Sequence, residues 1–273
     1  MKKFNTYKEF LNEGVGPLKH LTQEQVDWCN KHIEGKWSVN SKGEVTVSKN
    51  LSFKDRSFDR FPVQFASVKG DFNCSHCPNL ASLEGAPDHV DGGFDCSYCD
   101  NLVSLKGAPS HVDGYFYCYA CYELTSLKGA PDHVGGNSGC SDCPKLTSLE
   151  GAPAHVGGDF DCTECDNLTS LEGAPAHVGG DFDCNSCSTL TSLEGAPEHV
   201  GGDFVCSVCD NLTSLKGAPA HVGGEFDCEG CPKLPDSFDE IINDYNDDEI
   251  AWKRAHKLIN SKTYMGAKNI GLI

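Results

Sequence analysis

The chain has 273 residues, with 40 acidic against 22 basic side chains and a formal net charge of −18. This balance argues against a nucleic-acid-binding face, which needs clustered lysine and arginine, and permits a protein partner with a basic surface. No apolar run reaches the length of a membrane span, and residues 1–20 lack the apolar core of a secretory signal. We therefore expect the 17 cysteines to lie in a reducing compartment, and their odd number argues against a fully paired disulfide framework.

Residues 1–20 predict a short amphipathic helix and a linker. Phe4, Tyr7 and Phe10 have helical spacing, and the glycines and proline after Glu13 interrupt the pattern. A frayed terminal helix is the simplest interpretation of these residues.

The stretch from Thr6 to Glu13 also resembles the capsid-targeting peptide of internal head proteins from T-even-type bacteriophages. In that family a prohead protease cuts after a Leu/Ile-x-Glu triplet, and Leu11-Asn12-Glu13 before Gly14 matches this triplet. The resemblance implies a protein that is packaged inside the virion, trimmed to begin at Gly14, and delivered into the cytoplasm of the bacterial host.

Residues 21–57 predict an N-terminal cap made of a helix and a hairpin. Thr22 and Gln25 have the spacing of a capping box at the start of a helix over 21–33, and Gly35 ends it. Alternating valines on either side of a turn at 40–43 predict a β-hairpin. A stacked array needs such a cap, because its first unit would otherwise expose an apolar face and an unpaired strand edge.

Residues 58–234 repeat the pattern L-T-S-L-E-G-A-P-x-H-V-G-G-D-F-D-C-x-x-C with a period of 22 residues. A repeat this regular predicts a stacked array. Within each copy, Phe-x-Cys has the alternation of a strand whose Phe and Cys point inward, and the two leucines point inward from the return segment. Gly-Ala-Pro is unsuited to a helix, so we expect an extended convex side.

This pattern resembles the short leucine-rich repeats of bacteria and their phages. Residues 160–168 match the line L-x-L-x-x-N/C-x-L with one extra residue, and Gly-Ala-Pro recurs in each successive copy. Residues 37–50 also resemble the entry cap of phage-borne members. The resemblance implies a leucine-rich-repeat-like solenoid with one parallel β-sheet of about nine strands.

Residues 235–273 predict an α-helical C-terminal cap and a loose tail. Two short helices are expected, over 236–245 and 247–260, and their apolar residues would cover the last repeat. The second has acidic residues at its start and basic residues toward its end, as the helix dipole favours.

The paired cysteines raise the question of zinc, with Cys74, Cys77, Cys96 and Cys99 as candidate ligands. Strands stacked about 4.8 Å apart do not naturally bring four thiolates around one ion. We favour buried, reduced, structural cysteines, the second of each pair standing where related repeats carry a ladder-forming Asn, and we expect no cofactor. Metal binding and inter-repeat disulfides are the alternatives. A thioredoxin-like role is disfavoured because no helix follows the pairs.

A column of histidines forms the second repeated feature, on the turn that leads into the Phe-x-Cys strand. A metal-binding or pH-sensing stripe is one interpretation. We favour the other, in which each imidazole bonds a loop carbonyl and supports its neighbour. The column consists of His89, His111, His133, His155, His177, His199 and His221.

Departures from the repeat mark a candidate partner-binding surface. The outward strand positions are acidic or small in most units, and one unit replaces them with tyrosines. The next unit has Ser138 and Gly139 where others have Phe and a longer side chain, so the alternative is that tyrosines fill this gap. An aromatic cluster on an acidic face is typical of a binding hot spot. The predicted surface comprises Tyr98, Tyr115, Tyr117, Tyr119, Tyr122, Asp159, Asp161, Asp181 and Asp183.

The sequence contains no phosphate-cradling glycine loop before a helix and no Ser/His/Asp grouping outside the repeat. We therefore expect a protein without enzymatic activity that binds another protein through its concave acidic face. Together with the targeting-like peptide, this indicates a host protein as partner, such as a defence factor. The alternatives are a virion structural or assembly protein, a Cys/His-based zinc-binding protein, and a thiol redox enzyme.

Overall fold

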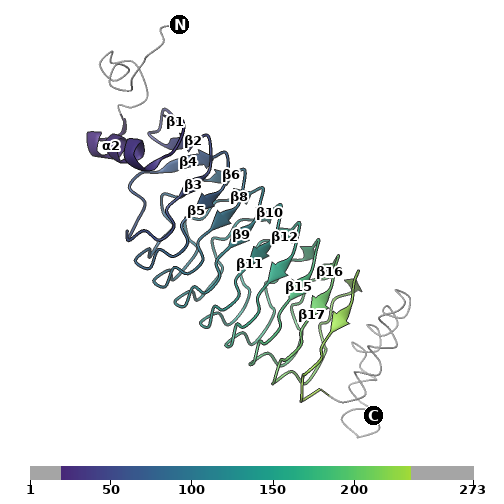
Figure 1. The fold of residues 1–273 in the computed structure, drawn as a ribbon. Coiled ribbons are helices and arrows are strands. Elements are labelled where there is room, and N and C mark those ends of the chain that lie inside the picture. Colours follow the sequence, from purple (N-terminus) through teal and green to yellow (C-terminus); the bar gives the residue numbers. More distant parts are fainter. Residues whose placement is uncertain (1–19, 235–273) are drawn as a thin grey trace, which may run out of the picture.

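The computed structural model of the chain describes residues 20–234 (Figure 1). The targeting-like peptide with Leu11, Glu13 and Gly14 and the two expected C-terminal helices lie outside the described residues. Within the part that the structure describes, no helix is long and apolar enough to cross a membrane.

The described chain begins with a helix and an antiparallel hairpin. Helix α2 (Gln23–His32) starts with a capping box, in which the Thr22 hydroxyl accepts from the Gln25 N–H at 3.2 Å and the Gln25 amide oxygen accepts from the Thr22 N–H at 2.9 Å. Strands β1 (Trp37–Val39) and β2 (Val45–Val47) then pair antiparallel. Cys29 and Ile33 bury their side chains in the same core as the repeats.

The repeats form a parallel β-solenoid of about eight turns, in which each turn gives one short strand to each of two sheets. The first, here called the histidine sheet, follows β1 and β2 with β4 (Phe65–Val68), β6 (His89–Val90), β8 (His111–Val112), β10 (His133–Val134), β12 (His155–Val156), β14 (His177–Val178), β16 (His199–Val200) and β18 (His221–Val222).

The second, here called the phenylalanine sheet, contains the Phe-x-Cys segments, and its nine strands agree with the number expected. It consists of β3 (Leu51–Ser52), β5 (Phe72–Asn73), β7 (Phe94–Asp95), β9 (Phe116–Tyr117), β11 (Ser138–Gly139), β13 (Phe160–Asp161), β15 (Phe182–Asp183), β17 (Phe204–Val205) and β19 (Phe226–Asp227).

The expectation of a single parallel sheet is wrong. The His-Val dipeptides, expected to lie on a turn, are strands, and each pairs with the same dipeptide of the next turn, as His155 does with His177. The sequence does not indicate these strands, because in most turns two glycines follow His-Val directly and have the composition of a turn, so no alternation continues beyond the dipeptide. Between residues 51 and 234 the structure contains no helix, so the return segments are extended.

The core is one continuous cluster between the two sheets and the return segments. Phe160, Cys162, Leu168 and Leu171 are each at most 1% exposed, which confirms the inward orientation of these positions. Rings of successive turns stack, for example Phe182 on Phe204 with centroids 5.3 Å apart. Each residue of a repeat therefore lies directly beside the residue 22 positions further along. Residues at the same repeat position thus contact one another along the length of the solenoid.

The glycine of Gly-Ala-Pro is required by the backbone. Gly151 has a φ of +95°, and a Cβ atom there would lie 2.5 Å from the backbone nitrogen of Lys128 in the preceding turn. Both observations explain why the seven Gly-Ala-Pro copies keep glycine at this position. In the view of Figure 1 the turns follow one another along an almost straight line, so the candidate surface is best defined by its strands rather than by a concavity.

Candidate functional site

Three of the predicted tyrosines form a row on the outer side of the phenylalanine sheet. Tyr115, Tyr117 and Tyr119 alternate with the buried Phe116 and Cys118 on and beside β9. Neighbouring rings stack, with centroids 4.7 Å apart in both pairs and interplanar angles of 20° and 25°. We call Tyr115, Tyr117 and Tyr119 the tyrosine row.

Glycines in the two adjacent turns make room for the row. A Cβ atom on Gly93 would lie 2.2 Å from the Tyr115 ring, and one on Gly139 would lie 2.4 Å from the Tyr119 ring. The outer rings therefore lean over the turns before and after β9. The Tyr119 ring covers Gly139, as the gap-filling interpretation expects. This contact with Gly139 also holds the orientation of the Tyr119 ring.

The hydroxyl groups of the row are held in the neutral state. Burial is the main cause that raises the pKa of Tyr119 far above its usual range, and the carboxylate of Asp161 adds to it. Burial also raises the pKa of Tyr115 and of Tyr117, although hydrogen bonds with Tyr119 and Asn137 oppose the shift at Tyr117. At neutral pH the row thus offers three aromatic faces with uncharged polar ends.

The rings of the other two predicted tyrosines do not stack on the row. Tyr98 and Tyr122 are 46% and 44% exposed, respectively. Tyr98 stacks on His76 at a centroid distance of 4.3 Å, and the Tyr122 hydroxyl donates to the Asp142 carboxylate at 3.4 Å. The backbone of Tyr98 lies next to the row, because its N–H donates to the Tyr119 carbonyl at 2.8 Å, but among the described residues no ring contact joins Tyr98 or Tyr122 to it.

The predicted acidic residues Asp159 and Asp181 tie neighbouring turns together. The Asp159 carboxylate accepts the backbone N–H of Asp181 at 3.0 Å, and the Asp181 carboxylate accepts that of Asp203 at 2.7 Å. Asp203 does the same for Glu225 at 2.7 Å. We call this series the carboxylate ladder. Its members have a structural role that the sequence pattern alone did not indicate.

Asp161 and Asp183 stabilise the bend after each strand. The Asp161 carboxylate accepts the N–H of Thr163 at 3.0 Å, and that of Asp183 accepts the N–H of Asn185 at 2.9 Å. Both are the i to i+2 contacts of an Asx turn. Burial raises the pKa of Asp183, and the bond from the Asn185 N–H opposes this shift.

The carboxylate ladder is interrupted at the tyrosine row. Asp71 accepts the N–H of Gly93 at 2.8 Å, but Gly93 and Tyr115 have no carboxylate to continue the series. The ladder resumes at Asn137, whose side-chain oxygen accepts the N–H of Asp159 at 3.1 Å. Aligning the repeats would have shown this column as Asp, Gly, Tyr, Asn, Asp, and this signal marks the row more sharply than aromatic content does.

The cysteines form a ladder of their own. In every C-x-x-C pair the second thiol donates to a backbone carbonyl of the preceding turn at 3.2–3.4 Å, as Cys99 does to Cys74. This contact ties each turn to the one before it. All 17 cysteines are buried, and no two of them are joined by a disulfide.

Among the described residues, no three sulfurs of the zinc candidates Cys74, Cys77, Cys96 and Cys99 lie within 4.8 Å of one another. Burial is the main cause that raises the pKa of each of these thiols, which opposes the thiolate form that redox chemistry requires. Within residues 20–234, one group of three side chains brings its ligand atoms close enough to hold a metal ion. It consists of His89, Asp91 and Asp113 and contains no sulfur.

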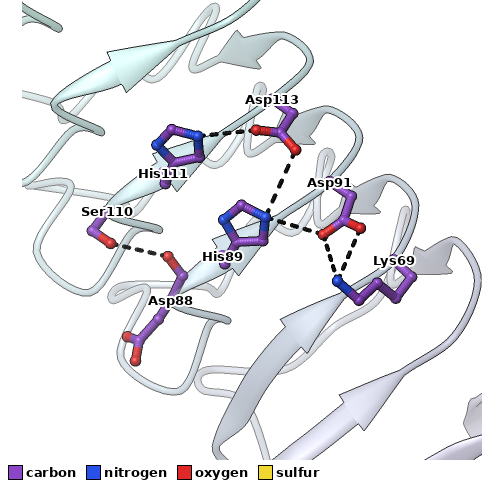
Figure 2. Close-up of polar contacts among 7 residues, drawn as sticks. All are labelled: Lys69, Asp88, His89, Asp91, Ser110, His111 and Asp113. Atoms are coloured by element: carbon purple, nitrogen blue, oxygen red, sulfur yellow. Dashed lines mark hydrogen bonds and ion pairs between the residues drawn. The ribbon is translucent and has the colours of Figure 1, made fainter.

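The histidine column lies on the outer side of the histidine sheet. Its rings stack on one another, for example His89 on His111 at 5.1 Å and His199 on His221 at 4.4 Å. Figure 2 shows that His89 and His111 point toward Asp91 and Asp113. In the described chain the imidazoles thus contact rings and carboxylates, so the expected bond to a loop carbonyl is not the common feature of the column.

A cavity of about 370 Å³ opens beside α2 at the N-terminal end of the solenoid. Aromatic side chains line it, and the rims carry two arginines in an otherwise acidic chain. Its lining includes Trp28, His32, Phe53, Arg56, Phe58 and Arg60. No sequence pattern indicated this cavity, because its lining residues come from the helix and from an irregular first turn.

No known protein family, curated protein or solved structure matches this chain. Any functional conclusion therefore rests on the surfaces described above.

Proposed function

We propose that this chain is a non-enzymatic scaffold that binds a protein partner through the tyrosine row. The observation that carries the proposal is the coincidence of three stacked tyrosines with the interruption of the carboxylate ladder. Two successive turns, at Gly93 and Tyr115, lack the backbone-tying carboxylate, and the second of them presents aromatic surface instead.

The physical properties of the row suit a protein interface. Tyrosine supplies large contact area at a low cost in side-chain entropy, and the rings of Tyr115 and Tyr119 are already held by packing over glycines. The carboxylates of Asp159 and Asp161 lie beside the row and favour a partner with basic groups at the rim. The scaffold is of the leucine-rich-repeat-like kind that the sequence resembles.

The experiment replaces the row with the residues that another turn carries at the same places. The triple variant Tyr115→Asp, Tyr117→Asp, Tyr119→Thr copies Asp161 and its neighbours Asp159 and Thr163, so the stacking contacts of the array are retained. We expect immobilised wild-type chain to capture one partner from a bacterial lysate, and the triple variant to lose at least about tenfold in affinity, as for residues at a hot spot.

The matched control is Tyr98→Ser with Tyr122→Ser, which removes the two exposed tyrosines outside the row. This variant should capture the partner as the wild type does. Equal capture by the triple variant and the wild type, measured by quantitative mass spectrometry, would contradict the assignment of the row.

We further propose that the setting is a bacteriophage. The support is the resemblance of the stretch from Thr6 to Glu13 to capsid-targeting peptides. The protein would be packaged in the head, cut after Glu13, and delivered to bind or inhibit a host protein such as a defence factor. Mass spectrometry of purified virions should then find the chain with Gly14 as its first residue, and a virion-associated chain that keeps Met1 would sink this proposal.

A further inference from the structure

Two turns of the histidine sheet differ from the others at one position. After His-Val the array has glycine, at Gly135, Gly157, Gly179, Gly201 and Gly223. The two turns that contain His89 and His111 have Asp91 and Asp113 in that place. Only two of the seven histidines of the column therefore have a carboxylate two residues later, and those two are adjacent.

Parallel pairing brings these four side chains together (Figure 2). The His89 Nε2 atom lies 3.1 Å from Asp91 Oδ1 and 3.7 Å from Asp113 Oδ2. The His111 Nε2 atom lies 2.9 Å from Asp113 Oδ1. One ligand atom from each of His89, Asp91 and Asp113 falls within 4.8 Å of the other two.

These separations suit a bound metal ion. Ligand atoms at about 2.0–2.2 Å from a tetrahedral zinc ion are separated by roughly 3.3–3.6 Å. Small side-chain rotations would bring the atoms of His89, Asp91 and Asp113 to such distances. The Asp113 carboxylate lies between the imidazoles of His89 and His111 and contacts both. His111 can therefore act as a fourth metal ligand, or it can hold the Asp113 carboxylate in position.

We infer that His89, Asp91 and Asp113, together with His111, form a binding site for a divalent transition metal ion of the zinc class. Mixed imidazole and carboxylate ligands favour zinc, cobalt or nickel over magnesium and calcium, which prefer oxygen alone. The ligand side chains are between 33% and 50% exposed, so the site is open to solvent and has room for a water or a ligand from a partner. It is independent of the cysteines and of the tyrosine row.

Lys69 competes for the site. This residue takes the place of Asp91 one turn earlier, and its Nζ atom contacts both Asp91 carboxylate oxygens, at 3.1 and 3.0 Å. A metal ion must share or displace this contact. Replacing Lys69 with Met should therefore strengthen metal binding, whereas a metal attached nonspecifically along the histidine column would not respond to this change.

The test uses the untagged full chain, reduced and freed of metal, titrated with Zn²⁺ against a chromophoric chelator. We expect one ion per chain. Asp91→Gly with Asp113→Gly, which restores the residue of the other turns, should weaken binding at least tenfold, and Lys69→Met should tighten it. Acidification should also weaken binding, because an imidazole must be deprotonated to coordinate a metal.

Two controls keep the outcomes distinct. His155→Ala with His177→Ala removes a stacked pair, with centroids 5.4 Å apart, that has glycine beside it and should leave binding unchanged. Cobalt spectra should show no thiolate charge-transfer band. Three results would each overturn the assignment. The first is equal Zn²⁺ affinity in the wild type and the Asp91→Gly, Asp113→Gly variant. The second is a loss of affinity in the His155→Ala, His177→Ala variant as large as in the double Asp variant, and the third is a thiolate band in the cobalt spectrum. Thermal unfolding without metal verifies that each variant folds.

Discussion

Many single residues in this chain form hydrogen bonds or ring contacts with an adjacent turn. The Cys165 thiol donates to the Cys140 carbonyl at 3.2 Å, and the Asp181 carboxylate accepts the Asp203 N–H. One position of the repeat has a left-handed backbone conformation, which residues other than glycine rarely adopt. The third residue of seven C-x-x-C segments has a positive φ, although none of the seven is glycine, at His76, Tyr98, Ala120, Asp142, Glu164, Ser186 and Val208.

Val208 should be the most strained of these residues, because it is β-branched and has a φ of +56°. We predict that Val208→Gly raises the free energy of unfolding by roughly 0.5–1 kcal/mol, since relief of the left-handed strain exceeds the backbone entropy that glycine costs. Gly230 already occupies the corresponding place in the last turn, with a φ of +68°. Urea unfolding of the two proteins measures the difference.

Val103→Gly is the matched control, because Val103 and Val208 are both 50% exposed and Val103 does not have a positive φ. This control should lose stability, as glycine does in an ordinary extended segment. A loss of similar size in both variants would show that the backbone at Val208 is not strained.

At the level of elements, the sequence predicts what has a recognisable local pattern. The capping box at Thr22 and Gln25 predicts α2, and the Phe-x-Cys alternation predicts the phenylalanine sheet. The histidine sheet has no such pattern, because glycines follow most His-Val dipeptides directly, whereas the Phe-x-Cys alternation continues past its two-residue strand. Its existence depends on the closure of each turn, which places His-Val beside His-Val of the next turn.

The same distinction applies to the candidate site. The tyrosine row could be found from its departure from the repeat. The function of Asp159 could not, because an outward carboxylate in a sequence has the same appearance whether it faces a partner or accepts an N–H group. The contact between His89 and Asp113 was likewise hidden, because it joins residues of different turns and depends on the parallel register of β6 and β8.

At the scale of the whole molecule, the buried thiols make stability depend on pH. Burial raises the pKa of Cys29 to about 11 and that of Cys121 to about 12, and it raises the pKa of many other core thiols as well. Below pH 9.0, the ordinary pKa of a thiol, both folded and unfolded chains keep these protons and stability is unaffected. Above it the unfolded chain releases protons that the folded chain retains, so stability falls as pH rises.

We predict a steep loss of stability between pH 9 and 11, by about 1.4 kcal/mol per pH unit for each thiol that stays protonated in the folded chain. Urea unfolding at a series of pH values, in a reductant that keeps all thiols free, measures the slope. Cys29→Ala removes one such thiol and should reduce the slope by about one proton's share. A stability that is constant through this range would contradict the burial of the cysteine ladder.

The in-register stacking has a further consequence for how this molecule can change over generations. Each turn offers to the next the same carbonyls, rings and carboxylates that it receives from the one before. A duplicated or deleted unit would therefore meet compatible neighbours on both sides. The distance from the turns that carry the tyrosine row and the His89 and Asp113 cluster to the far end of the solenoid can thus be lengthened or shortened in whole units, which makes the rest of the array an adjustable spacer.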